Sequence, residues 1–211
     1  MSRRARGSTD AGLHYVWNVS ALPDGVFRDY GDARVCALLL EMRSRDDAVD
    51  LLAWRFRAAR YDLVLRPVGA TDLGAFMRRV LSAWSGHHRK RDGQSRRLWT
   101  DRYHSVAVQP GPALPALVTE LTGDPRDSGR CRWPWVGPSD RAVDPPPATG
   151  DPSADAHSQD RLRQLVRHSL RNRLPVGEPG WIEEELARRG RLRPPGRRGR
   201  PRKAPTEATP D

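Results

Sequence analysis

Residues 71–90 carry the strongest periodic pattern in this 211-residue chain and constrain the fold most. Apolar side chains recur there at spacings of three and four residues, namely Leu73, Phe76, Met77, Val80, Leu81 and Trp84. This spacing places them on one face of a helix, and Thr71 has a side chain suited to cap its first turn. We therefore expect a helix with one buried face.

Segments rich in β-forming residues lie on either side of this helix. Residues 14–20 and 103–108 each favour a strand, whereas residues 51–56 and 61–65 alternate in polarity around a break at 58–60 and favour a β-hairpin. A second helix is predicted from Asp32, and a short one near residues 114–123. The apolar residues expected to form the packed face of the helix from Asp32 are Val35, Ala37, Leu38, Leu39 and Met42.

The order strand, helix, strand, strand, helix, strand is typical of a ferredoxin-like α+β fold, an antiparallel sheet with its helices on one face. We assign this domain to residues 11–136, preceded by a disordered N-terminus over residues 1–10. Proline, aspartate and serine dominate residues 137–158, which are predicted to be a disordered linker. Residues 159–190 contain two short helical patterns, and residues 191–211 form a basic, proline-rich tail without predicted structure.

The composition favours a polyanionic partner. The formal charge is +11 and the pI about 10.9, and arginine supplies nearly all of the positive charge because Lys90 and Lys203 are the only lysines. Arginine suits phosphate groups and guanine edges, although a GC-rich coding sequence would also enrich arginine. Cys36 and Cys131 fit no zinc spacing, and no apolar stretch approaches the roughly 18 residues of a membrane span. We expect a cytoplasmic, nucleoid-associated protein without a membrane partner.

Basic side chains gather around the second helix and the turn that follows it. We expect these residues to bind DNA phosphates, with Trp99 or Tyr103 available to stack on bases. The tail around Gly199 and Pro201 resembles an AT-hook that could enter the minor groove, the alternative being a solvated basic tail. The predicted DNA-binding residues are Arg78, Arg79, Arg89, Lys90, Arg96, Arg97, Arg102, Arg198, Arg200, Arg202 and Lys203.

Several blocks, in conserved order along the chain, resemble the REP-associated tyrosine transposases of the IS200-like group. His14-Tyr15-Val16 resembles the opening strand of that family, Val26-Phe27-Arg28-Asp29 its following turn, and the block from Leu98 to His104 its Leu-Trp-Gln-Gly-Arg-Phe-Lys segment. Further matches are Pro134-Trp135, Asn172-Arg173, Pro175, Gly177, Trp181, Leu192-Arg193-Pro194 and the stretch from Gly199 to Lys203. The family's Asn-Pro-Val-Arg-Ala-Gly segment is missing between Val108 and Trp133.

The resemblance implies a single-strand DNA enzyme with a ferredoxin-like fold. In the family a His-x-His pair on a central strand binds Mg²⁺ or Mn²⁺, and a tyrosine on a neighbouring helix attacks the phosphorus to form a 5′-phosphotyrosine. Alignment on residues 63–67 puts Arg60 and Asp62 at the histidine positions. The nucleophile positions of the helix over residues 71–90 fall on Trp84 and His87. We expect no intact catalytic set, no metal ligands and no cofactor unless activity is retained.

Three hypotheses follow from these residues. The leading one is a DNA-binding protein derived from a REP-associated transposase, which holds hairpin or single-stranded DNA without cleaving it. One alternative is an active transposase that uses Tyr61 or Tyr103 as nucleophile and Asp62 as a surviving metal ligand. The other alternative is a decayed remnant without function. Family members can form homodimers, and the sequence leaves the oligomeric state open.

Overall fold

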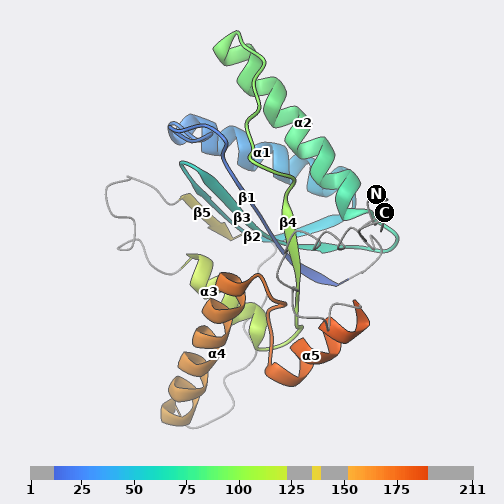
Figure 1. Cartoon of the computed structure of the whole chain (residues 1–211), viewed down its shortest axis with the longest axis vertical. Coiled ribbons are helices and arrows are strands. Elements are labelled where there is room, and N and C mark those ends of the chain that lie inside the picture. Colours follow the sequence, from blue (N-terminus) through green and yellow to red (C-terminus); the bar gives the residue numbers. More distant parts are fainter. Residues whose placement is uncertain (1–11, 123–134, 139–151, 190–211) are drawn as a thin grey trace, which may run out of the picture.

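An antiparallel sheet lies at the centre of the protein, as a computed structural model shows for residues 12–122, 135–138 and 152–189 (Figure 1). Its strands are β1 (Leu13–Val19), β2 (Val49–Arg57), β3 (Arg60–Pro67), β4 (His104–Val108) and β5 (Trp135–Pro138). The helices are α1 (Tyr30–Asp46), α2 (Leu73–Asp92), α3 (Ala113–Thr122), α4 (Pro152–Asn172) and α5 (Pro179–Arg188). None of the helices in these described ranges is long and apolar enough to cross a membrane.

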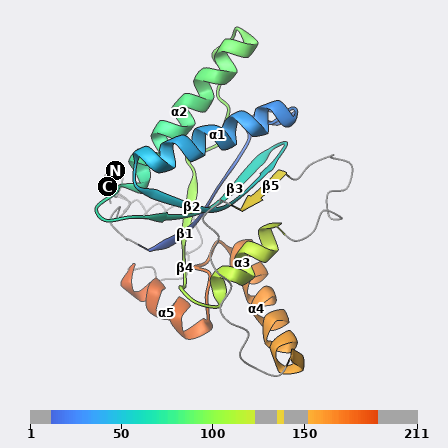
Figure 2. The ribbon, with the colours of Figure 1, turned by 180° about the vertical axis from the view of Figure 1, so that it is seen from behind.

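The sheet has the order β4-β1-β3-β2-β5, and all its neighbouring strands are antiparallel. Together with the two helices α1 and α2 on one face, the order of the first four strands confirms the predicted ferredoxin-like α+β fold (Figure 2). The strands β2 and β3 form the predicted hairpin, in which Arg57 pairs with Arg60 across a two-residue turn. Gly25 packs on this turn with φ of +81°, a conformation that favours glycine.

The apolar face of α2 packs on the sheet as predicted. Phe76, Met77, Val80 and Trp84 are buried there together with side chains of α1 and of β1 to β3. The cap differs from the prediction, because the side chain of Asp72 accepts a hydrogen bond of 2.7 Å from the Gly74 amide. Thr71 instead bonds the carbonyls of Asp47 and Val68 with its hydroxyl, so it fixes the preceding turn rather than capping the helix.

The expected packed face of α1 is confirmed in part, because Ala37 is buried and Val35 and Leu39 pack partly buried against the same core. Leu38 and Met42 are exposed, and the buried positions are Ala33, Cys36, Ala37 and Leu40. Apolar residues surround most of this helix, so their spacing does not select one face. The buried residues Ala33, Cys36 and Ala37 are small, so a search for large apolar side chains does not detect them.

Helices also cover the other face of the sheet, which the sequence did not indicate. A second apolar cluster on that face joins Tyr15, Trp17 and Val64 of the sheet to Leu117 of α3 and Val166 of α4. The helices α3, α4 and α5 accordingly lie on the opposite side of the sheet from α1 and α2 (Figures 1 and 2). Each face of the sheet therefore belongs to a separate core.

Two elements differ from the predicted domain plan. Strand β5 pairs with β2 over residues 135–138, where no strand was predicted, and α4 begins at Pro152, within the segment assigned to the linker. Disorder was predicted for residues 1–10 and for the linker, and an unstructured tail was predicted at the C-terminal end. Residues 1–11, 139–151 and 190–211 lie outside the described residues, so these predictions are not tested there. Cys36 is buried as a free thiol, and Cys131 also lies outside them.

Candidate nucleic-acid interface

The four residues aligned with the catalytic positions of the family do not form one site. Arg60 and Asp62 project from β3 toward the face covered by α3, because they alternate with Tyr61 and Leu63 of the other core. Trp84 is buried between α2 and the opposite face of the sheet, where its ring stacks on Phe27 at 5.2 Å. Trp84 on α2 therefore lies on the opposite side of the sheet from Arg60 and Asp62.

Protein donors hold the Asp62 carboxylate through one of its oxygens, while the buried Oδ2 accepts no hydrogen bond from the residues that the structure describes. Its Oδ1 accepts hydrogen bonds of 2.5 Å from the Tyr15 hydroxyl and 2.8 Å from Nε of Arg60, and Nη2 of Arg60 also donates to the Tyr15 oxygen at 2.7 Å. Burial and then the charge of Asp62 raise the pKa of the Tyr15 phenol far above its ordinary value. Tyr15 is thus a buried, protonated hydrogen-bond donor rather than a nucleophile.

This arrangement does not fit a divalent metal. Asp62 is 0% exposed, and the guanidinium of Arg60 lies where a cation would have to approach its carboxylate. The described ranges contain no group of three His, Cys, Asp or Glu residues placed to hold a metal ion. Divalent cations in proteins need several oxygen or imidazole ligands. The side chains around Asp62 therefore give no route to metal-assisted attack on a phosphate.

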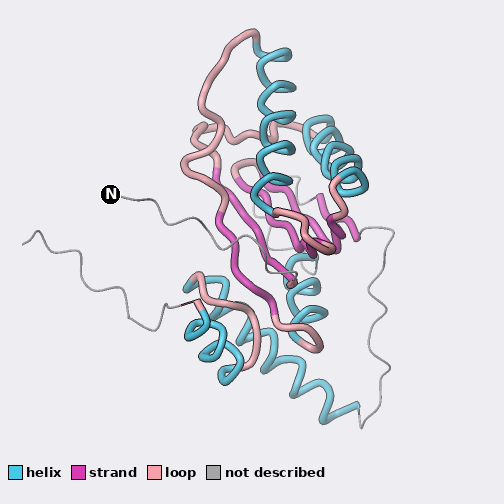
Figure 3. The backbone as a smooth tube through the Cα atoms, turned by 90° about the vertical axis from the view of Figure 1, so that its right-hand side faces the viewer, coloured by secondary structure: helices cyan, strands magenta, loops and turns pink. Residues whose placement is uncertain are grey.

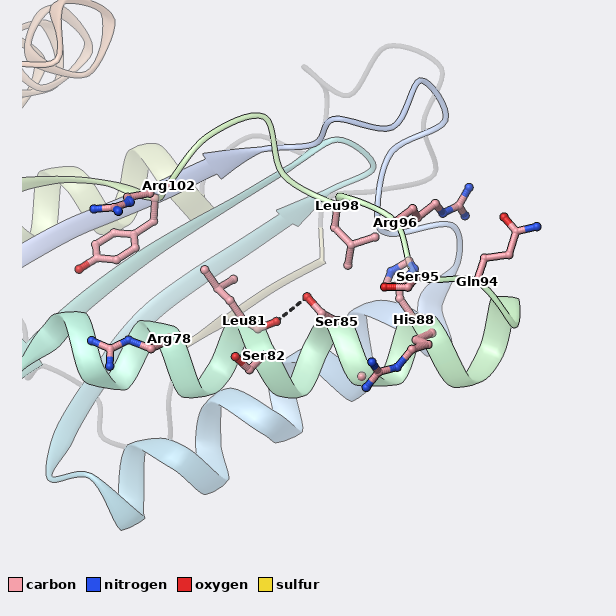
Figure 4. A pocket seen from close by; sticks show the side chains of 13 residues that line it. Arg78, Leu81, Ser82, Ser85, His88, Gln94, Ser95, Arg96, Leu98 and Arg102 are labelled. Atoms are coloured by element: carbon pink, nitrogen blue, oxygen red, sulfur yellow. Dashed lines mark hydrogen bonds between the residues drawn. The ribbon is translucent and has the colours of Figure 1, made fainter.

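A basic groove lies on the other side of the sheet, between α2 and the loop of residues 93–103, which folds back along the helix (Figure 3). Its volume is about 630 Å³. One wall is a stripe of four α2 residues, Arg78, Ser82, Ser85 and Arg89, whose spacing places them on one helical face (Figure 4). The remaining lining residues include Leu81, Gly86, His88, Gln94, Ser95, Arg96, Leu98, Arg102 and Tyr103.

The charge of the groove comes from arginines without acidic partners. Arg78, Arg89 and Arg102 are exposed and make no ion pair with the residues that the structure describes. Arg96 differs, because it pairs with Asp92 at 2.5 Å. Hydrogen bonds from Arg28, and also from Arg91 and Arg96, lower the pKa of Asp92 well below its usual range, so this carboxylate stays charged. The groove keeps a positive surplus and offers guanidinium donors at both walls.

The predicted DNA-binding residues divide into those that line the groove and those that do not. Arg79 forms an ion pair of 2.7 Å with Asp47, and Lys90 is exposed on α2 away from the groove lining. Arg97 bonds the carbonyls of Trp99 and Thr100, so it fixes the loop. The tail residues Arg198, Arg200, Arg202 and Lys203 lie outside the described part of the chain.

The two proposed stacking residues have different environments. Trp99 is buried in the core and meets Tyr61 edge-on at 5.0 Å, so its ring faces are not available to a base and that prediction is wrong. Tyr103 is half-buried and lines the groove. Ser82 and Ser85 were not predicted to lie in the site, although their spacing from Arg78 and Arg89 indicates one polar helical face.

His88 closes the inner wall of the groove. Its Nε2 lies 2.8 Å from the carbonyl of Val26, and its other ring nitrogen faces Arg91 at 3.3 Å. Burial lowers the pKa of this histidine. A neutral His88 that donates to Val26 ties α2 to the loop before α1, so its role in the wall is structural.

Comparison with solved structures finds nine chains that match, and two of them are described here. One is a REP-associated tyrosine transposase bound to a REP hairpin, with a TM-score of 0.47 and 13% identity over 57% of this chain and 70% of that chain. The other, from Deinococcus radiodurans R1, is assigned as a transposase, with a TM-score of 0.36 and 16% identity over 56% of this chain and 94% of that chain. No family model matches the sequence, and no curated protein matches it.

Proposed function

We propose that this protein is a diverged relative of the REP-associated tyrosine transposases that binds single-stranded or hairpin DNA in the groove beside α2 and does not cleave it. The observation that carries the proposal is that the α2 stripe of Arg78, Ser82, Ser85 and Arg89 lines one groove together with Arg102 and Tyr103 of the following loop. Guanidinium groups bind phosphates with charge-assisted hydrogen bonds, and a tyrosine ring can stack on an unpaired base.

The positions of the family-like blocks in the fold support this assignment. Phe27 stacks on Phe56 and Trp84, and Leu98 and Trp99 enter the same core. The loop that closes the groove is thereby anchored at the block that begins with Leu98. The residues that resemble the family therefore include core residues that support the loop of the groove.

Two of the four tyrosines are unsuited to act as nucleophiles. Tyr15 and Tyr61 are buried, and burial raises the pKa of both phenols. Tyr103 lines the groove, so it is the tyrosine by which the alternative of residual activity can be tested. No group at Asp62 would assist it, because the sheet lies between them.

Binding is tested by fluorescence anisotropy with a labelled hairpin and a single-stranded oligonucleotide over a range of salt. We expect Arg89→Gln and Arg102→Gln each to weaken binding about three- to tenfold and to reduce the salt slope by about 1. Arg45→Gln removes an equal charge from an exposed position on α1 and serves as the control. Equal affinities for all variants would contradict the proposed groove.

Cleavage is tested by incubating the protein and the hairpin with Mg²⁺ or Mn²⁺ and searching for a covalent adduct on a denaturing gel. We expect none. An adduct that disappears in Tyr103→Phe would establish the active alternative instead. Absence of any salt-sensitive DNA binding near physiological ionic strength would favour the remnant without function.

A further inference from the structure

Three arginines converge on Asp62, on the face of the sheet opposite to the groove. Nη2 of Arg60 lies 2.7 Å from Oδ1 of Asp62. Nε of Arg55 lies 3.6 Å and Nη2 of Arg57 lies 3.9 Å from Oδ2. The alternation of β2 and β3 produces this arrangement, because Arg55 pairs with Asp62 and Arg57 with Arg60 across the hairpin. We call Arg55, Arg57 and Arg60 the arginine cluster.

The arginine cluster carries more charge than Asp62 can balance. Arg60 and the Tyr15 hydroxyl donate hydrogen bonds to Oδ1 of the carboxylate, whereas the buried Oδ2 accepts none from the described residues and faces Arg55 and Arg57 at 3.6 and 3.9 Å. Glu120 of α3, whose carbonyl accepts a hydrogen bond from Arg55, pairs through its carboxylate with Arg167. Among the described residues the three arginines therefore share the single negative charge of Asp62, which leaves a surplus of two positive charges, the charge of a divalent cation.

The arginine cluster contains a hydrogen-bond donor that is not satisfied. Nε of Arg55 is buried and makes no hydrogen bond among the described residues, because Oδ2 of Asp62, which is likewise unbonded, lies 3.6 Å away. A buried donor without an acceptor is costly, and like charges directly opposite in a sheet, as at Arg57 and Arg60, repel each other. Exposure of the side chains rises from 16% at Arg55 to 32% at Arg60 and 47% at Arg57. An anion can reach the cluster from solvent on the Arg57 side.

We infer that the arginine cluster is a metal-independent binding site for a phosphate group. A tetrahedral oxyanion would accept hydrogen bonds from two or three guanidinium groups and relieve their repulsion, as planar arginine forks do at phosphates elsewhere. The site thus supplies with fixed arginines the positive charge that a divalent cation supplies in the family that the sequence resembles. If the proposed DNA-binding function holds, the phosphate belongs to a polynucleotide; otherwise it belongs to a small phosphorylated compound.

The test is calorimetric titration of the full chain with inorganic pyrophosphate in excess chelator. We expect binding that Arg57→Gln weakens at least tenfold and Arg45→Gln leaves unchanged. Arg57→Gln is the more informative variant, because the side chain of Arg57 is half exposed and lies 3.9 Å from the Asp62 carboxylate. Arg60→Gln disturbs the buried carboxylate, so circular dichroism is needed to verify that this variant folds. Equal pyrophosphate affinity in the Arg57→Gln and Arg45→Gln variants, or no binding by the unaltered chain, would overturn the inference.

A competition experiment identifies the source of the phosphate. A single-stranded oligonucleotide that displaces pyrophosphate, and does so less well in Arg57→Gln, assigns the site to a polynucleotide backbone. Failure of oligonucleotides to bind, with pyrophosphate binding still sensitive to Arg57→Gln, assigns it to a small phosphorylated compound. In that second outcome the proposed function fails and the site stands, so the two are distinguishable.

Discussion

The hydroxyl of Tyr15 donates a hydrogen bond of 2.5 Å to Asp62, and both side chains are buried beneath α3. This bond joins β1 to the central strand β3. Because the same carboxylate oxygen also accepts from Arg60, the bond fixes the position of a charge in a site of low polarity, where a lost donor is costly.

We therefore expect Tyr15→Phe to lower the free energy of unfolding by about 2 kcal/mol, the usual range for a hydrogen bond to a charged group. Asp62→Asn should cost more, about 3 to 5 kcal/mol, because it leaves the arginines without their carboxylate. Urea denaturation of both variants measures the difference. A larger loss in Tyr15→Phe than in Asp62→Asn would show that Asp62 is not the centre of the network.

The alternation along β2 and β3 shows how much of this network the sequence contained. Arg55 and Arg57 share one face of a strand, Arg60 and Asp62 share one face of the next, and a two-residue turn sets them opposite each other. The hairpin was predicted, and its register brings these four side chains together. The contact of Tyr15 with Asp62 could not be predicted in this way, because the two residues are 47 positions apart and meet only through the strand order.

The relation between α2 and β3 could not be derived from local patterns. The spacing from Leu73 to Trp84 predicted the buried face of α2 correctly, but it does not say which face of the sheet that side covers. A helix after β3 can pack on either side until the handedness of the whole fold is known. For the same reason the second layer of α3 and α4, built around Leu117 and Val166, remained unpredicted.

His88 should make the free energy of unfolding depend on pH in a range above that of its neighbouring carboxylates. Burial holds its folded pKa below the ordinary value of 6.5, while its neighbours Asp32, Asp92 and Arg91 remain charged. The unfolded chain therefore takes up a proton first as pH falls. This contribution to stability is complete above about pH 6.5 and is lost as pH falls through the folded pKa.

We expect the free energy of unfolding to fall between pH 7 and pH 5, and His88→Gln to flatten that dependence while keeping a donor for the Val26 carbonyl. Urea denaturation at several pH values measures the slope. Contributions of Asp32 and Asp92 appear at more acidic pH, because their ordinary pKa of 3.8 is lowered further by the fold. An unchanged slope in His88→Gln would assign the dependence to other groups.

The contact of Gly25 with the turn between β2 and β3 can be tested by comparing alanine substitutions at Gly25 and at Gly93. Both have positive φ, +81° and +66°, but a Cβ at Gly25 would lie 2.1 Å from the Ala58 carbonyl oxygen, whereas one at Gly93 would meet no atom within 4 Å. Gly93→Ala should cost about 1 kcal/mol from its backbone conformation alone. Gly25→Ala should cost well above about 2 kcal/mol, because backbone must also move. Similar melting temperatures for the two variants would contradict this contact.

Trp99 and Tyr103 lie four residues apart and should respond differently to truncation. Trp99 is buried against Tyr61 and Phe27, so Trp99→Ala should lower the free energy of unfolding by about 3 to 5 kcal/mol, as loss of a buried indole usually does. Tyr103 is half-buried in the groove wall, so Tyr103→Ala should cost less stability but weaken binding of single-stranded DNA about tenfold, the usual effect of a lost base-stacking ring.

Urea denaturation and anisotropy, both measured below the unfolding midpoint of each variant, separate these effects. Tyr103→Phe keeps the ring and should bind single-stranded DNA nearly as the unaltered chain does, since stacking needs the aromatic face rather than the hydroxyl. If Tyr103→Ala bound as tightly as Tyr103→Phe, no base would stack at this position, and phosphate contacts from Arg78, Arg89 and Arg102 would account for the affinity of the groove.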